Sequence, residues 1–109
     1  MNREILDNKI TQWGLDRGII LNGNSIAQVI KLQEEVAEIL EALVNNDHDN
    51  LALEIGDLYV VCSMIAGIEG LTMNKCIEGA YNKIKDRTGY LREDGVFVKD
   101  HPQQTYMEL

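Results

Sequence analysis

The sequence predicts an all-α protein, in which four helices pack as a bundle and a short extended tail follows. Three observations lead to this fold class. The chain has 109 residues and a single proline, it is 45% hydrophobic, and its apolar residues recur at helical spacing between polar or glycine-containing breaks. The length suits one domain, so residues 1–109 are expected to fold as a single unit.

The first helix is expected over residues 2–13. Gly14 and Gly18 follow it, and a glycine-containing loop begins at residue 21. Glycine is a poor helix former and is common where helices stop, so these positions are expected to end the helix. The apolar stripe of this segment is approximate and consists of Ile5, Leu6, Ile10 and Trp13.

The second helix is expected to begin at Ser25, because Gln28 stands three residues later and completes a capping-box pattern. The polar run at residues 45–50 ends it. Its apolar residues recur every three or four positions, as on a helix with one buried face. They are Val29, Leu32, Val36, Ile39, Leu40 and Leu43.

Two further helices are expected at residues 51–68 and 72–87. Asp47 or Asp49 is the candidate N-cap of the first of these. Residues 96–98 follow an Asp-Gly turn signal and form a short extended piece at most. The connections are short, which favours antiparallel neighbours in a helix bundle.

The net charge is −8, from 18 acidic and 10 basic residues. This balance disfavours binding to a nucleic acid duplex or to an anionic membrane surface. No signal-like segment opens the chain, and the longest apolar uncharged run, residues 58–68, is shorter than the roughly 20 residues that span a bilayer. We therefore expect a cytoplasmic protein that binds neither duplexes nor membranes. Residues 1–60 hold 11 acidic and 4 basic residues, which is nearly all of the excess.

Part of this excess forms two carboxylate pairs. Glu35 and Glu38 lie three residues apart in the second predicted helix, and Glu54 and Asp57 repeat that spacing in the third. Residues three apart lie about 60° from one another around a helix, on one flank. Two adjacent antiparallel helices would therefore direct four carboxylates toward one point.

The two pairs differ in their expected surroundings. The acids of the second helix also suit a plain solvated face, because Glu34, Glu38 and Glu41 point away from its apolar stripe. The third helix is apolar around nearly its whole circumference and is expected to be buried, which carries Glu54 and Asp57 into the interior or an interface. A buried, unpaired carboxylate usually becomes protonated or binds a cation, and the basic residues of the first two helices are too few to neutralise this cluster.

A hard divalent cation is the best candidate to neutralise these carboxylates. A cluster of carboxylates without His or Cys favours Mg²⁺, with Mn²⁺ as a substitute, and Mg²⁺ commonly completes its shell with water and substrate phosphates. A di-iron site would need Glu-x-x-His pairs, and the only histidines are His48 and His101, expected in a loop and in the tail. Phosphate-ester or nucleotide chemistry is therefore indicated.

These residues resemble a known family. Glu34-Glu35-Val-Ala-Glu38, then 15 residues, then Glu54-Ile-Gly-Asp57 resembles the EExxE…ExxD signature of MazG-type nucleotide pyrophosphohydrolases, in the all-α NTP pyrophosphatase superfamily. The resemblance implies Mg²⁺-dependent hydrolysis of nucleoside triphosphates between the α and β phosphates. It implies that Glu35, Glu38, Glu54 and Asp57 bind the metal and that Glu34 supports the ligands or orients the attacking water.

The resemblance also implies where the substrate and a second subunit lie. Family members contact phosphates from the fourth helix, and the matching candidates here are Lys75, Asn82 and Lys85, with Lys31 before the signature as a further substrate-binding candidate. Trp13 is a candidate for stacking on a base, against the plain alternative that it packs in the core. The family forms dimers or tetramers, so the bundle is expected to be completed by homo-oligomerisation.

Two alternatives stay open at this stage. One is a base-specific relative within the superfamily, a dUTP, dCTP or phosphoribosyl-ATP hydrolase. The other belongs to a different class: a non-catalytic helical dimerisation module whose acids are solvated or hold a structural cation. Activity on a nucleotide panel separates the enzymes from one another, and a joint response to Mg²⁺ and nucleotide separates them from the module.

Overall fold

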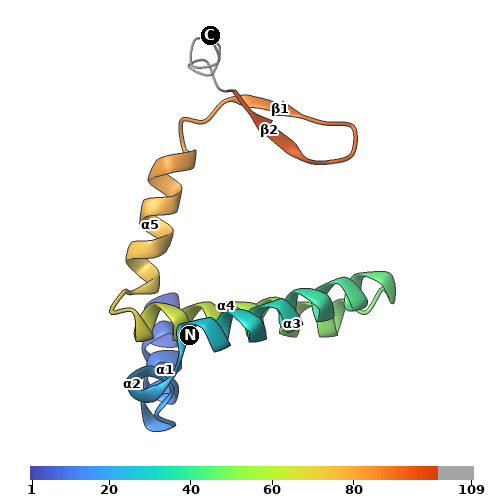
Figure 1. Ribbon diagram of the computed structural model, residues 1–109. Helices are drawn as coiled ribbons and strands as arrows, with labels where there is room; N and C mark the ends of the chain where they lie inside the picture. Colours follow the sequence, from blue (N-terminus) through green and yellow to red (C-terminus); the bar gives the residue numbers. More distant parts are fainter. Residues whose placement is uncertain (101–109) are drawn as a thin grey trace. The chain divides into compact units, whose positions relative to one another are not determined.

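The computed structural model describes residues 1–100, and the predicted all-α fold is confirmed there (Figure 1). Two compact units are present, Met1–Cys76 and Ile77–Leu109, and each is described by itself. His101 lies outside the described residues. The elements are α1 (Arg3–Asp16), α2 (Ile19–Asn22), α3 (Ser25–Val44), α4 (His48–Ile68), α5 (Met73–Ile84), β1 (Gly89–Leu91) and β2 (Phe97–Lys99).

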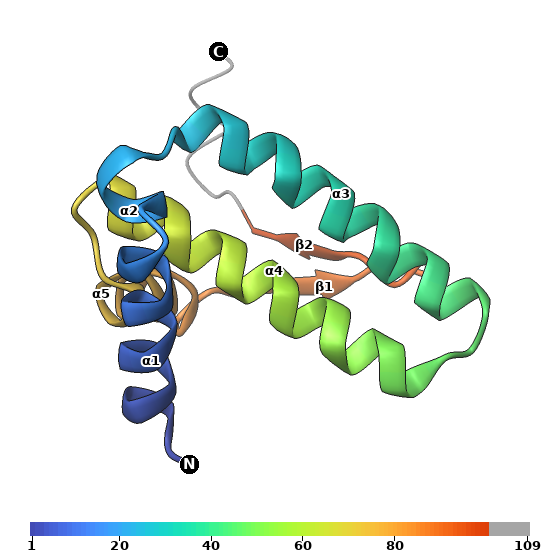
Figure 2. The same cartoon turned by 90° about the horizontal axis from the view of Figure 1, so that it is seen from below.

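The centre of the first unit is an antiparallel pair of long helices, α3 and α4, which lie side by side in both views (Figures 1 and 2). A tight turn joins them, with Asn46 at a positive φ of 53°. Asp47 caps α4, since its Oδ1 accepts a hydrogen bond from the Asn50 amide at 3.1 Å. The cap prediction is therefore confirmed for Asp47, and the helix begins at His48, earlier than the predicted residue 51.

The prediction that Gly14 ends the first helix is wrong, because α1 continues to Asp16. Gly14 is buried, and a Cβ added there would lie 2.4 Å from Met64 Sδ. The glycine therefore serves close packing against α4. The chain then turns at Gly18, whose φ is +73°, and the expected loop contains the short helix α2.

Ser25 does not cap α3, contrary to the sequence-based prediction. The cap is Asn24, whose Oδ1 accepts from the Ala27 amide at 3.0 Å. The Ser25 hydroxyl instead donates to the Glu69 carboxylate at the far end of α4. The Ser25 side chain therefore makes a tertiary hydrogen bond to Glu69 instead of the local capping bond that the sequence pattern predicts.

The second unit contains most of α5 and a β-hairpin. Helix α5 ends at Ile84, before the predicted Arg87. The extended piece predicted near residues 96–98 is present as β2, which pairs antiparallel with β1 so that Tyr90 faces Val98. Gly95, at a φ of +88°, makes the turn that the Asp-Gly pair indicated.

Burial inside the single chain is limited. Within the described part of the chain, the buried hydrophobic side chains are Ala42, Val61, Met64 and Ala66, all on α3 or α4. The helix predicted at residues 51–68, which is α4, is expected from its sequence to be buried. Only its second half is, because Leu53 in its first half is 67% exposed. By length and composition alone α4 could also cross a membrane, a property that core helices of soluble proteins share.

Candidate metal centre and the adjoining cavity

Three carboxylates meet between α3 and α4. Glu35 and Glu38 come from α3 and Glu54 from α4, and one oxygen of each lies within 4.8 Å of the others. The i, i+3 spacing places the two α3 residues on one flank, and the antiparallel pairing brings α4 beside them. The meeting of these three residues, predicted from their spacing, is therefore present in the structure.

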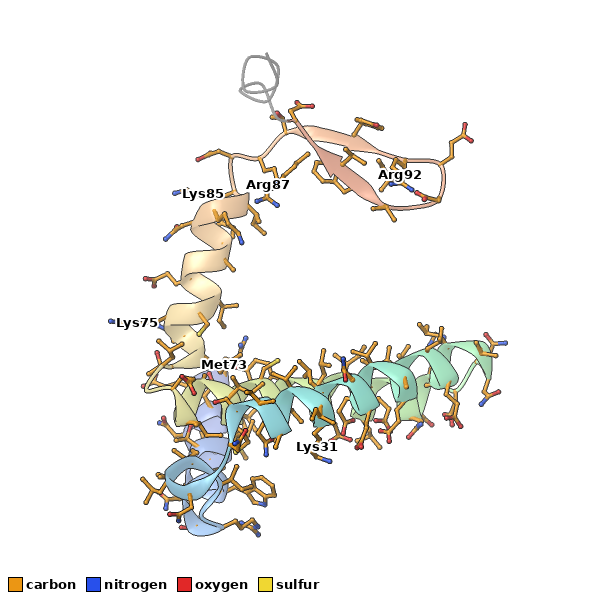
Figure 3. The ribbon with its side chains drawn as sticks, in the orientation of Figure 1. Lys31, Met73, Lys75, Lys85, Arg87 and Arg92 are labelled. Atoms are coloured by element: carbon orange, nitrogen blue, oxygen red, sulfur yellow. The ribbon has the colours of Figure 1, made fainter. Side chains whose placement is uncertain are left out.

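The cluster is graded in exposure. Glu35 is buried, Glu54 is half-buried and Glu38 is exposed. Oε2 of Glu35 and Oε2 of Glu54 are both buried without a hydrogen-bond partner. The other oxygen of Glu35 has one cationic neighbour, Lys31 Nζ at 3.9 Å, from an exposed side chain (Figure 3). Buried acceptors without partners are rare in folded proteins, and an absent ion is one explanation for them. This donor set fits a hard divalent cation.

The surroundings disfavour the charged forms of two of these groups. Hydrogen bonding with Glu38, followed by burial and the charges of Glu38 and Asp57, raises the pKa of Glu54 to about 7. Burial, and then the neighbouring Glu38 charge, raises the pKa of Glu35. Without a cation, these carboxylates therefore hold protons at pH values where an ordinary carboxylate is ionised.

The two remaining predicted acids are placed differently. Asp57 is exposed one turn beyond Glu54, near enough for its charge to raise the pKa of both Glu35 and Glu54. It borders the three-carboxylate cluster without being one of the three. Glu34 is exposed on α3, and the described structure does not bring it into the cluster.

A cavity of about 540 Å³ adjoins the carboxylates. Its walls come from α1, α3 and α4, and combine apolar side chains with two lysines and two acids. Trp13 is 41% exposed there, and the Arg17 guanidinium lies 4.6 Å from the centre of its ring. The lining residues are Leu6, Lys9, Ile10, Trp13, Lys31, Glu35, Asp57, Val60 and Val61. Two predicted substrate residues, Trp13 and Lys31, thus share one cavity with two predicted metal ligands.

The other predicted substrate residues lie on or just after α5. Lys75 is exposed in the first turn of that helix, in the first unit. Asn82 and Lys85 are exposed residues of the second unit (Lys85 in Figure 3). Their roles remain expectations that rest on the resemblance.

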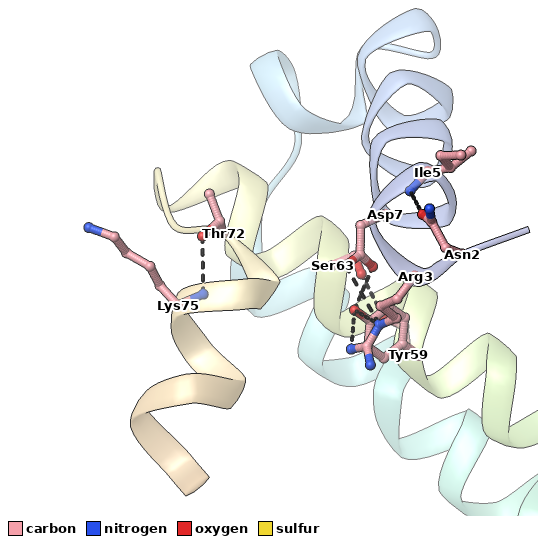
Figure 4. A network of polar contacts seen from close by, with 8 residues as sticks. All are labelled: Asn2, Arg3, Ile5, Asp7, Tyr59, Ser63, Thr72 and Lys75. Carbon is pink, nitrogen blue, oxygen red and sulfur yellow. Dashed lines mark hydrogen bonds and ion pairs between the residues drawn. The ribbon is translucent and has the colours of Figure 1, made fainter. Parts of the chain in front are cut away.

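Sequence reasoning overlooked a polar network and one lysine. The hydroxyl group of Tyr59 is bonded to Asp7 and Arg3 of α1 (Figure 4). The only available signal was the i, i+4 spacing of Arg3 and Asp7, which marks an ordinary helix ion pair. Lys9 lines the cavity, but nothing in the sequence around it distinguishes it from an ordinary surface lysine.

The fold and the site together define an all-α protein with a cluster of three carboxylates on a helical hairpin. A family model for the MazG nucleotide pyrophosphohydrolase domain matches residues 25–91, more than half of the chain and the whole of α3 and α4. The chain belongs to the MazG family. Neither the curated proteins nor the solved structures gave a match. Membership assigns nucleotide pyrophosphohydrolase activity in general terms, and the family is generally dependent on a divalent metal.

Proposed function

We propose that this protein hydrolyses nucleoside triphosphates, NTP or dNTP, at the α–β phosphate bond, giving a nucleoside monophosphate and pyrophosphate. The observation that carries the proposal is the pair of buried, unpartnered oxygens on Glu35 and Glu54, beside a cavity lined by Trp13 and Lys31. The cavity offers one aromatic face for a base and cationic groups for phosphates, next to a set of metal-ligating acids.

Mg²⁺ is the proposed cofactor, with Mn²⁺ as a substitute. Glu35, Glu38 and Glu54 would hold it, and Asp57, which borders them, is the proposed fourth ligand. When bound, such a cation offsets phosphate charge and lowers the pKa of a coordinated water. Because Lys31 is the one cation paired with the cluster among residues 1–100, the acids would otherwise repel a polyanionic substrate.

The chain's own residues bind and orient the nucleotide in this proposal. Trp13 stacks on the base, since an aromatic ring half-exposed in a cavity offers apolar area with little entropy to lose. Lys31, which lines the same cavity, attracts phosphate oxygens, and Glu34 orients the attacking water. On the resemblance alone, Lys75, Asn82 and Lys85 are proposed to contact phosphates.

Self-association as a homodimer or tetramer is part of the proposal. Large apolar side chains on the described surface of α3 and α4 are more than half exposed in the single chain, among them Val36, Leu40 and Leu53. Monomers rarely expose so many large apolar side chains on two neighbouring helices, and a second copy would cover them. We further propose a cytoplasmic protein that binds neither nucleic acid duplexes nor membranes, consistent with the net charge of −8.

The direct test measures pyrophosphate release from a panel of NTPs and dNTPs with Mg²⁺. Glu38→Gln and Asp57→Asn are expected to lower kcat/KM by at least about a hundredfold, because each removes a proposed metal ligand. Glu41→Gln is the matched control, an exposed acid of the same helix outside the cluster, and should retain wild-type activity. Release of orthophosphate only, or full activity in both site variants, would refute the proposal.

The non-catalytic module is separated by thermal melting with Mg²⁺, a nonhydrolysable nucleotide, or both. An enzyme of the proposed kind is stabilised most by the two ligands together, because the nucleotide binds through the cation. A module with a structural cation responds to Mg²⁺ alone. The same nucleotide panel identifies a dUTP, dCTP or phosphoribosyl-ATP preference.

A further inference from the structure

The hydroxyl group of Tyr59 joins α4 to α1 (Figure 4). It donates to Asp7 Oδ1 at 2.6 Å and accepts from Arg3 Nη2 at 2.7 Å and Nε at 3.2 Å. Nε of Arg3 also lies 3.6 Å from Asp7 Oδ2, and the guanidinium carbon of Arg3 is 4.8 Å from the centre of the Tyr59 ring. Each of the three side chains therefore contacts the other two.

The attachment of α1 to α4 is otherwise thin. Gly14 is the one buried residue of α1, and it packs against Met64. Among residues 1–100, the side-chain hydrogen bonds between these two helices all involve Tyr59. Helix α1 therefore meets α4 through the polar network near its start and through the glycine contact near its end.

Between these two places, α1 presents Lys9, Ile10 and Trp13 to the cavity beside the carboxylates. Helix α4 supplies Asp57 and Val60 to the same cavity, on either side of Tyr59 in the sequence. A shift of α1 at its first turn would pivot it about Gly14 and change the separation of its cavity face from α4. The network and the cavity face are neighbours on α1, so loss of the network is expected to change the width of the cavity.

We propose that the network of Arg3, Asp7 and Tyr59 positions α1 so that Trp13 and Lys9 meet the nucleoside part of the substrate, which makes the three residues determinants of substrate affinity. The inference rests on the proposed nucleotide hydrolysis. None of the three lines the cavity, so they act through α1. Their loss would weaken binding while the carboxylate cluster on α3 and α4 stays intact.

Tyr59→Phe tests the proposal with the smallest change. It removes the hydroxyl but keeps the ring beneath Arg3, and it leaves the Arg3–Asp7 pair free to form. KM for the best substrate is expected to rise about threefold to tenfold, with kcat within about twofold and an unchanged Mg²⁺ dependence. The matched control is Gln12→Ala, which removes a 2.7 Å bond to Asp16 on the exposed side of the same helix and should leave KM unchanged.

Asp7 gives an independent variant with a conservative rescue. Asp7→Ala removes the acceptor of the Tyr59 hydroxyl and should raise KM as Tyr59→Phe does, whereas Asp7→Asn keeps an Oδ1 acceptor and should restore most of the affinity. The double variant Asp7→Ala/Tyr59→Phe should bind no more weakly than the poorer single variant, because both break one network. Additive effects would overturn the inference.

Trp13 is the only tryptophan, so its fluorescence reports the placement of α1 without any substrate. Tyr59→Phe should change its emission and quenching by iodide, and Gln12→Ala should not. If wild type hydrolyses nucleotides but Tyr59→Phe leaves KM and Trp13 emission unaltered, the positioning role is wrong. If wild type hydrolyses none but Tyr59→Phe still changes Trp13 emission, the positioning of α1 stands and the proposed function fails.

Discussion

Glu35 on α3 and Glu54 on α4 each hold a carboxylate oxygen that is buried without a hydrogen-bond partner, and both belong to one three-carboxylate cluster. Two such groups repel each other when both are ionised, and each loses hydration on burial. The fold without metal accommodates them by retaining protons, whereas a divalent cation would accommodate them as anions. Stability, pH and metal binding are therefore linked at this pair.

The stability of the metal-free protein should fall as the pH rises from about 4.5 to about 7. Glu54 has a pKa of about 7 in the fold against an ordinary value of 4.5, so the folded state binds more protons than the unfolded state in this range. Deprotonation above pH 7 then leaves like charges together. Thermal melts in chelator between pH 4.5 and 8 measure the effect.

Glu54→Gln provides the matching variant, because an amide keeps the shape without the titration. Its melting temperature should depend less on pH in this range than that of wild type, and Mg²⁺ should stabilise it little. In wild type, Mg²⁺ should stabilise more at pH 8 than at pH 5.5, since ligands must lose protons to bind metal. An identical pH dependence in the two proteins would contradict the linkage.

Gly14→Ala should destabilise the fold by about 1–3 kcal/mol, because its Cβ would overlap the buried side chain of Met64. Gly79→Ala is the matched control, a glycine inside α5 where a Cβ would meet no atom within 4 Å. That change should stabilise by about 0.5–1 kcal/mol through helix propensity. Urea unfolding measures both, and equal effects of the two substitutions would show that Gly14 does not serve packing.

Trp13→Ala should raise KM about tenfold, as expected for the loss of one aromatic stacking partner of a base. The effect on kcat should be small, because the carboxylates are untouched. Trp13→Phe retains a ring and should lie between wild type and Trp13→Ala. Steady-state pyrophosphate release gives both constants. An unchanged KM in Trp13→Ala would assign the residue to packing alone.

Leu40→Glu should reduce the mass of the assembly measured by light scattering at micromolar concentration. Leu40 is 62% exposed on a stripe with Val36 and Leu43, and a charge there opposes burial against a second copy. Leu40→Met keeps the apolar character and should assemble as wild type does. A wild-type mass equal to that of one chain would contradict the proposed self-association.

Local pattern in the chain is enough to predict much of this protein. Helical spacing of apolar residues locates the four main helices, and Asp47 marks the start of α4 because capping depends only on neighbours in sequence. The i, i+3 spacing of Glu35 and Glu38 places them on one flank of α3. These features depend on contacts within a few residues, which is why residue order suffices for them.

Features that depend on contacts between residues far apart in the sequence could be identified only from the tertiary structure. Gly14 is buried inside α1 against Met64, 50 positions later, and Ser25 bonds to Glu69 in place of capping α3. The partial burial of α4 and the Tyr59 link to α1 also follow from helix placement. Spacing along the chain brings the acids to one flank of each helix, but the close pairing of α3 and α4 decides which oxygens lose their water and need a cation.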